Sequence, residues 1–209
     1  MASDNVVNLP QRGKTYLSGG NRTIDSTQTT SKAIMGIRKV FKDLDFSATT
    51  PSNTSAKAPR SGGEVTCILV RNSSGAAMLP GRMAVWKSGA EGKEVDGYTT
   101  TDYAKVAGVV DEWLPAAGVA DKDLFWLVVN GPCNIKKSLD ANALVVDDYV
   151  VAITAATSHS TTAGRIMSIS LQNNATSNTS MALNRVGIAM STSGTTGANV
   201  LTYVDLLGG

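Results

Sequence analysis

EVTCILVRNSSG, residues 64–75, joins a β-type run to a cluster of turn residues. Glu64–Arg71 is rich in β-branched and apolar residues, and the Asn-Ser-Ser-Gly that follows favours a turn. The same combination recurs as far as the C-terminal end, and no long helical pattern alternates with it. The sequence therefore predicts a mainly β protein, an antiparallel β-sandwich or barrel.

Eight further runs have the length and composition of short strands. They are Met83–Trp86, Lys105–Val110, Leu124–Val129, Asn134–Lys136, Leu144–Ile153, Ile166–Leu171, Val186–Met190 and Val200–Leu206. The longer joins between the runs are expected to be loops: Ser88–Tyr103, Ser158–Gly164 and Asn173–Asn184.

One segment before these runs has helical spacing. In TTSKAIMGIRKVFKDLDF, residues 29–46, apolar side chains recur at Ile34, Ile37, Phe41 and Leu44, which is typical of one face of a helix. Gly36 weakens this interpretation, and the β-branched content also permits a strand over residues 37–41. We therefore expect at most one short helix in the chain.

The first part of the chain has the composition of an extended arm and linker. Residues 1–28 are dense in Gly, Asn, Ser and Thr, and residues 47–63 are small and polar with two prolines. We accordingly divide the chain into an N-terminal arm and linker, residues 1–60, and a β-domain, residues 61–209. The sequence leaves open whether this β-domain is one barrel or two lobes that divide near Leu139.

Charge is sparse and unevenly distributed. Charged residues make up 17% of the chain, against about a quarter in average domains. Residues 1–60 carry nine Lys and Arg against four Asp and Glu, a net charge of +5, and the remainder carries −3. The basic residues are scattered with few aromatics among them, which argues against direct nucleic-acid binding and favours contact with an acidic protein surface.

The residues needed for catalysis or metal binding are not grouped in the sequence. The single histidine, His159, lies in a polar loop without a neighbouring nucleophile and orienting carboxylate. Cys67 and Cys133 have no histidine at a metal-ligand spacing. The acidic pairs are interpreted as solvated turn residues: Asp111-Glu112, Asp121 with Asp123, and Asp147-Asp148. We expect no enzyme, no cofactor and no catalytic or metal site.

The two cysteines and the N-terminal residues indicate the cellular compartment in which the protein is made. Buried free thiols are the commonest state for such cysteines, although a bridge between Cys67 and Cys133 stays open. Residues 1–10 lack the features of a signal peptide, and no apolar stretch approaches the length of a membrane span. We expect synthesis in the cytoplasm and no membrane partner.

The order of motifs in the β-domain resembles that of capsid decoration (cement) proteins of tailed phages. The resemblance is carried by VTCILVRNSSGAAMLPGRMAVWKSG (residues 65–89) and VDGYTTTDYAKVAGVVDEWLPAAGVADKDLFWLVVNGP (residues 95–132). NRVGIAMSTSGTTGANVLTYVDLL (residues 184–207) completes it. It covers about two-thirds of the chain and implies β-barrel or sandwich subunits, commonly homo-trimers or dimers, that brace the outer capsid surface of the virion.

The resemblance implies roles for particular residues. The arm would wrap around the major capsid protein through sparse apolar anchors and basic residues that pair with acidic groups. These capsid-binding candidates are Val6, Leu9, Arg12, Lys14, Tyr16, Leu17, Arg22, Ile24, Arg38 and Lys39. The large aromatics are expected in the core or at a subunit interface: Trp86, Trp113, Phe125 and Trp126.

A second function stays open from the sequence. The chain is alternatively a phage head-fibre or tail appendage module that binds a host-surface receptor or glycan. Exposed aromatic platforms in the loops would favour that alternative, and the loops that start at Ser158 and Asn173 are nearly free of aromatics.

Overall fold

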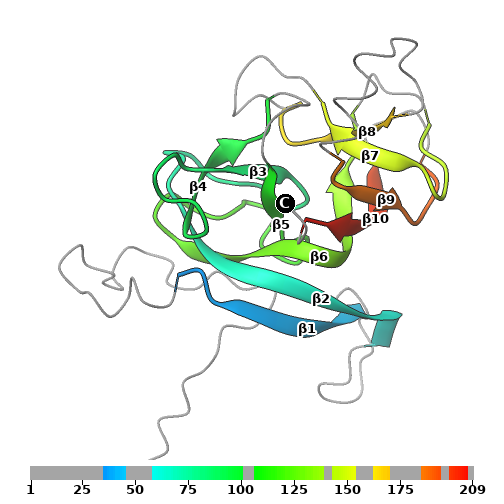
Figure 1. The fold of residues 1–209 in the computed structure, drawn as a ribbon, viewed down its shortest axis with the longest axis horizontal. Helices are drawn as coiled ribbons and strands as arrows, with labels where there is room; N and C mark the ends of the chain where they lie inside the picture. The colour runs from blue at the N-terminus through cyan, green and yellow to red at the C-terminus, as the bar shows by residue number, and fades with distance from the viewer. Residues whose placement is uncertain are drawn as a thin grey trace, which may run out of the picture.

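The computed structural model describes residues 35–45, 58–100, 106–138, 143–153, 162–169, 185–193 and 198–206. These residues form ten strands and essentially no helix (Figure 1), which confirms the expected mainly β fold. The strands are β1 (Arg38–Asp45), β2 (Ala58–Asn72), β3 (Met83–Trp86), β4 (Glu94–Tyr98), β5 (Val106–Val110), β6 (Leu124–Lys136), β7 (Tyr149–Ala152), β8 (Ile166–Ser168), β9 (Gly187–Ala189) and β10 (Asn199–Asp205).

Five of the strands close into a barrel. The order of pairing is β2-β4-β3-β5-β6, and β6 pairs again with β2. All of these pairs are antiparallel except β2 with β4, where Arg71 lies opposite Glu94 and Asn72 opposite Val95. The parallel pair arises because the β3–β4 hairpin turns back so that β4 runs in the same direction as the end of β2.

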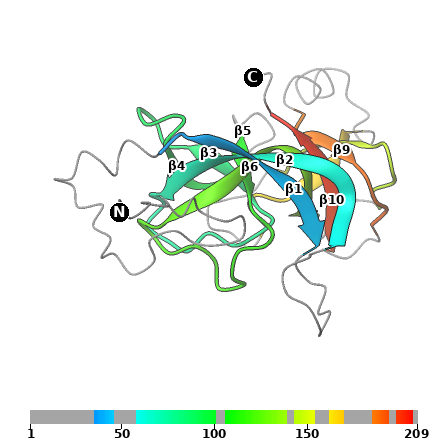
Figure 2. The same ribbon diagram turned by 90° about the horizontal axis from the view of Figure 1, so that it is seen from below.

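The other strands extend the same sheet from the long members of the barrel. β1 pairs with the outer side of β2, and β10, β9, β7 and β8 follow one another from the second half of β6. Figures 1 and 2 show β2 and β6 bending through the molecule, with β1 beside β2 and the C-terminal strands beyond β6. β6 therefore belongs to both halves of the structure.

Two hydrophobic clusters fill these halves, and β2 and β6 send alternate side chains into each. Val70 and Phe125 belong to the barrel cluster, which draws on all five barrel strands. Leu69 and Trp126 belong to the second cluster, which lies between β2, β6 and the C-terminal strands. A strand buried on both faces has no polar alternation, which explains the continuous apolar run LFWLVV at residues 124–129. The barrel and the C-terminal strands therefore share β2 and β6, and Leu139, where the sequence left a division open, lies outside the described residues.

The helical interpretation is wrong for residues 38–45, where the alternative strand is present as β1. Phe41 lies opposite Val65 on β2, and its ring meets Trp126 edge to face at 5.2 Å. Packing on β2 thus outweighs the helical spacing, as tertiary contacts often do. β1 lies within residues 1–60, so the sheet includes residues on both sides of the expected boundary at residue 60.

Two further differences concern the strands themselves. β4 lies within Ser88–Tyr103, which was expected to be a loop; only Val95, Gly97 and Tyr98 of its five residues are buried. The runs Leu124–Val129 and Asn134–Lys136 form one continuous strand, β6. The thiols of Cys67 and Cys133 are buried in the second cluster and form no disulfide.

Candidate binding surfaces

Most of the capsid-binding candidates lie outside the described residues. These are Val6, Leu9, Arg12, Lys14, Tyr16, Leu17, Arg22 and Ile24. The two that the structure describes, Arg38 and Lys39, are adjacent residues of β1 and so point to opposite faces of the sheet. Arg38 is exposed, whereas the Lys39 ammonium lies 5.0 Å from the centre of the Phe41 ring. They therefore do not form a single basic patch.

An exposed apolar surface runs across β7, β9 and β10, side by side at the right of Figure 1. Tyr149 and Tyr203 lie opposite Ile188 from its two sides, which makes one row across three strands. Met190 and Leu201 add a second row, in which Met190 N donates to Leu201 O at 2.7 Å. We call these five residues the tyrosine face; Tyr149 is 49% exposed and Tyr203 42%.

Polar groups border the tyrosine face. The Arg185 guanidinium lies 5.4 Å from the centre of the Tyr149 ring, and its Nη2 lies 3.7 Å from Asp205 Oδ2. The Tyr203 hydroxyl donates to Asn130 Oδ1 at 3.4 Å. These contacts orient both tyrosine rings while leaving them open to solvent, and aromatic, Met and Arg side chains are the types enriched in protein interfaces.

Our reasoning from the sequence missed the tyrosine face, although β10 carries a signal for it. In this strand Val200, Thr202 and Val204 are buried, and the residues between them point outward. Alternation with apolar residues in the outward positions, Leu201 and Tyr203, marks an apolar outer face. Tyr149 has no such signal, because its exposure follows from the register of β7 with β9.

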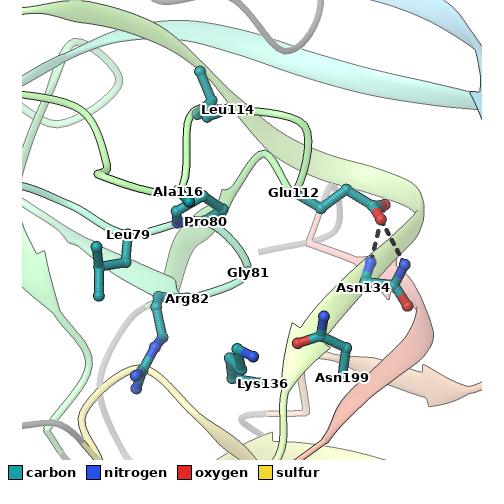
Figure 3. Close-up of a pocket in the computed structure, with 10 residues that line it drawn as sticks. All are labelled: Leu79, Pro80, Gly81, Arg82, Glu112, Leu114, Ala116, Asn134, Lys136 and Asn199. Atoms are coloured by element: carbon teal, nitrogen blue, oxygen red, sulfur yellow. Dashed lines mark hydrogen bonds between the residues drawn. The ribbon is translucent and has the colours of Figure 1, made fainter. Parts of the chain in front are cut away.

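A cavity of about 350 Å³ opens beside the turn that precedes β3 (Figure 3). Glu112 accepts hydrogen bonds from Asn134 through its backbone N at 3.1 Å and through Nδ2 at 2.5 Å. The Arg82 side chain points away from Glu112 in Figure 3, and its Nη1 donates to Ala163 O at 2.7 Å. Burial, together with the nearby charge of Arg165, lowers the pKa of Arg82.

These contacts indicate a structural use for the polar groups of the cavity. Glu112 binds β6, and Arg82 binds the segment before β8, so each holds two elements of the same chain together. The remaining lining residues supply amide, ammonium and apolar groups: Leu79, Pro80, Gly81, Leu114, Ala116, Lys136 and Asn199. The arrangement offers no nucleophile beside a base, so we do not assign chemistry to the cavity.

One member of each acidic pair named from the sequence holds a turn, but the expectation that these residues are solvated is wrong for Asp111 and Asp123, which are buried. Asp121 accepts from Gly75 N at 3.0 Å, Asp148 from Val145 N at 3.1 Å and Asp111 from Trp113 N at 3.2 Å. Within the described ranges, no group of three or more His, Cys, Asp and Glu side chains is arranged to hold a metal ion. His159 lies outside those ranges.

In the part of the chain that the structure describes, no helix has the length and apolarity to cross a membrane. Comparison of the sequence with protein-family models and with curated proteins gives no match. The function therefore rests on the surfaces described above.

Proposed function

We propose that this protein is a non-enzymatic structural component of a virion that binds the outer surface of a tailed-phage capsid and stabilises it. The observation that carries the proposal is the tyrosine face, an exposed apolar surface on a well-packed sheet. Contiguous apolar surface on a folded domain is characteristic of an interaction site, because it would otherwise be buried. The motif order of the β-domain agrees with this role.

The proposed partner is the major capsid protein, together with further copies of this chain. The N-terminal arm would supply additional contacts, with Val6, Leu9 and Tyr16 among its anchors. Two separate contact regions, a rigid face and an arm, bind more tightly when both engage the same shell. Repetition of such weak contacts around a symmetric capsid gives high occupancy without a strong individual interface.

The test is co-sedimentation of the purified protein with capsids that lack it, alongside light scattering of the free protein. We expect saturable binding at a symmetric number of copies per shell. The double substitution Tyr149→Ser and Tyr203→Ser removes the two exposed aromatic rings of the tyrosine face. It should weaken capsid binding at least tenfold. Leu79→Ser is the matched control, because Leu79 is also exposed but lies in the turn before β3.

A second experiment separates the arm from the β-domain. Deleting residues 2–30 is expected to abolish capsid attachment while the urea midpoint of the β-domain stays unchanged. An arm-less protein that decorates capsids at wild-type occupancy would remove the arm from the proposal. Absence of binding by the intact protein, with a stable free oligomer, would contradict the capsid role itself.

One observation favours the alternative appendage function. That function requires exposed aromatic rings, and Tyr149 and Tyr203 provide two of them on strands rather than in loops. Sugar rings stack on aromatic faces and use neighbouring polar groups for specificity. Binding of the wild type to a glycan array, lost in the double Tyr→Ser variant, would support this alternative over capsid binding.

A further inference from the structure

The outer edge of β1 is an unpaired strand edge within the described part of the chain. β1 stands at one end of the order of strands, and its described pairing is with β2 alone. Figure 1 shows no described strand beyond it. A strand in this position presents a row of backbone donors and acceptors to which another extended segment can be added.

The register identifies the residues whose backbone groups face outward. Leu69 N donates to Ile37 O at 2.9 Å, and Arg38 lies opposite Ile68. In an antiparallel pair, alternate residues direct both N–H and C=O toward the same neighbour. Ile37, Lys39 and Phe41 therefore face β2, whereas the residues between and after them, Arg38, Val40 and Lys42, face away from it.

The side chains of these three outward residues have a simple pattern. Successive alternate residues of a strand share one face, so Arg38, Val40 and Lys42 stand in a row. Arg38 and Lys42 are exposed, and Val40 between them is 51% exposed. The carboxylate nearest in register is Glu64, opposite Lys42 on β2, so the row keeps net positive charge.

We propose that β1 binds an extended acidic segment of another protein as an added strand. The segment would place an apolar residue opposite Val40 and an Asp or Glu two residues away on either side, opposite Arg38 and Lys42. Opposite charges placed directly across a strand pair stabilise it, whereas like charges destabilise it. The same argument disfavours pairing of β1 with a second copy of itself about Val40, because Arg38 would then face Lys42.

The inference rests on the proposed function in taking the partner to be a capsid subunit. The strand pairing itself is tested without capsids, on the full-length protein. The probe is a fluorescein-labelled peptide of sequence TETVTET, with TKTVTKT as its charge-reversed control, in fluorescence anisotropy at low salt. We expect saturable binding of TETVTET and at least tenfold weaker binding of TKTVTKT.

Two variants make the test specific to this edge. Val40→Pro removes an N–H that faces away from β2, so it should block an added strand without breaking the β1–β2 pair. TETVTET binding should fall at least tenfold at an unchanged urea midpoint. The double substitution Arg38→Glu and Lys42→Glu should reverse the preference, so that TKTVTKT binds more tightly than TETVTET. This second variant keeps the test decisive if Val40→Pro fails to fold.

The outcomes separate this inference from the capsid role. Equal binding of both peptides, no binding of either, or an unchanged preference after charge reversal would overturn the added strand. If Val40→Pro still co-sediments with capsids at wild-type occupancy while the peptides fail to bind, the capsid role stands and the edge is not its contact. Charge-dependent peptide binding by a protein that ignores capsids would support the edge site and contradict the capsid role.

Discussion

Arg71 and Glu94 lie directly opposite each other in the parallel pair of β2 and β4 that closes the barrel, and their side chains form an ion pair. Ser73 Oγ donates to the second carboxylate oxygen at 2.7 Å, and Lys87 Nζ lies 3.4 Å from it. Parallel pairs are slightly weaker per residue than antiparallel ones, and only two residue pairs form here. The Glu94 carboxylate therefore reinforces the weakest pairing in the barrel.

Removal of the Glu94 charge should destabilise the β2–β4 pairing that closes the barrel. We expect Glu94→Gln to lower the free energy of unfolding by about 1–2 kcal/mol, because hydrogen bonds to a partly buried charged group are lost. Urea unfolding with an unchanged m value would measure the loss. Asp96→Asn is the control, since Asp96 is exposed on the same strand and should change stability by less than about 0.5 kcal/mol.

The same carboxylate should make stability depend on pH. Burial by itself raises the pKa of Glu94, but the hydrogen bond from Ser73 and the charge of Arg71 outweigh it, so the pKa lies below its usual value. This contribution is present above the pKa of the unfolded chain, about 4.3, and is lost as the pH falls through the folded pKa. We expect the wild type to lose more stability than Glu94→Gln on acidification below pH 5, and parallel curves would contradict this assignment.

Asp123, which directly precedes β6, should affect the pH dependence of stability in the opposite direction. Its side chain is buried, and desolvation raises its pKa above the usual value. The ionised form is therefore disfavoured in the folded protein, and stability is lost as the pH rises through the folded pKa. Asp123→Asn should raise the free energy of unfolding at pH 7, with a difference from the wild type that shrinks toward pH 4.

Asp121 is a matched control for that experiment. Despite partial desolvation, hydrogen bonds involving Lys122 and Gly75 N lower its pKa. Asp121→Asn should therefore decrease stability at pH 7 rather than increase it. Changes of the same sign in both variants would show that loss of a negative charge, and not burial, causes the effect.

Gly131 should tolerate no side chain. It has a φ of +102°, and a Cβ at this position would lie 2.3 Å from Glu64 O on β2. A left-handed conformation and a backbone clash together should cost at least about 2 kcal/mol in Gly131→Ala. Gly75 has a φ of +77° with open space around it, so Gly75→Ala should lose only about 1 kcal/mol. Thermal unfolding of both variants would separate the clash from the conformational cost.

Local sequence patterns were sufficient for most of the strands. β3 and β5 coincide with runs of apolar and β-branched residues between turn signals, which act over a few residues. β2 contains such a run from residue 64 onward, but its first six residues, 58–63, lie in the stretch expected to be a linker. β4 carries only Val95 and Tyr98 as large buried apolar residues, and its pairing with β2 depends on residues more than twenty positions away. The assignment of β1 was ambiguous for the same reason, because Trp126, whose ring contacts Phe41 of β1, lies far along the chain.

The surfaces were harder to predict than the strands. Arg38 and Lys39 look alike in sequence, but only the register with β2 shows that Arg38 faces outward and that Lys39 packs on Phe41. The tyrosine face depends on Tyr149 and Tyr203 meeting across Ile188, three segments that no short-range pattern connects. Exposed surface is set by pairing between distant strands, which a single sequence does not specify.

The sharing of β6 between two clusters has a consequence for synthesis of the protein. Its second half pairs with β10, which ends at Asp205, about seventy residues later. While the ribosome adds those residues, at about 5–20 per second, that half of β6 lacks its neighbour for several seconds. For that interval the nascent chain carries a strand segment, residues 130–136, whose backbone donors and acceptors lack their partners in β10. A chaperone that shields such unpaired strand edges would raise the yield of folded protein more than added thermodynamic stability would.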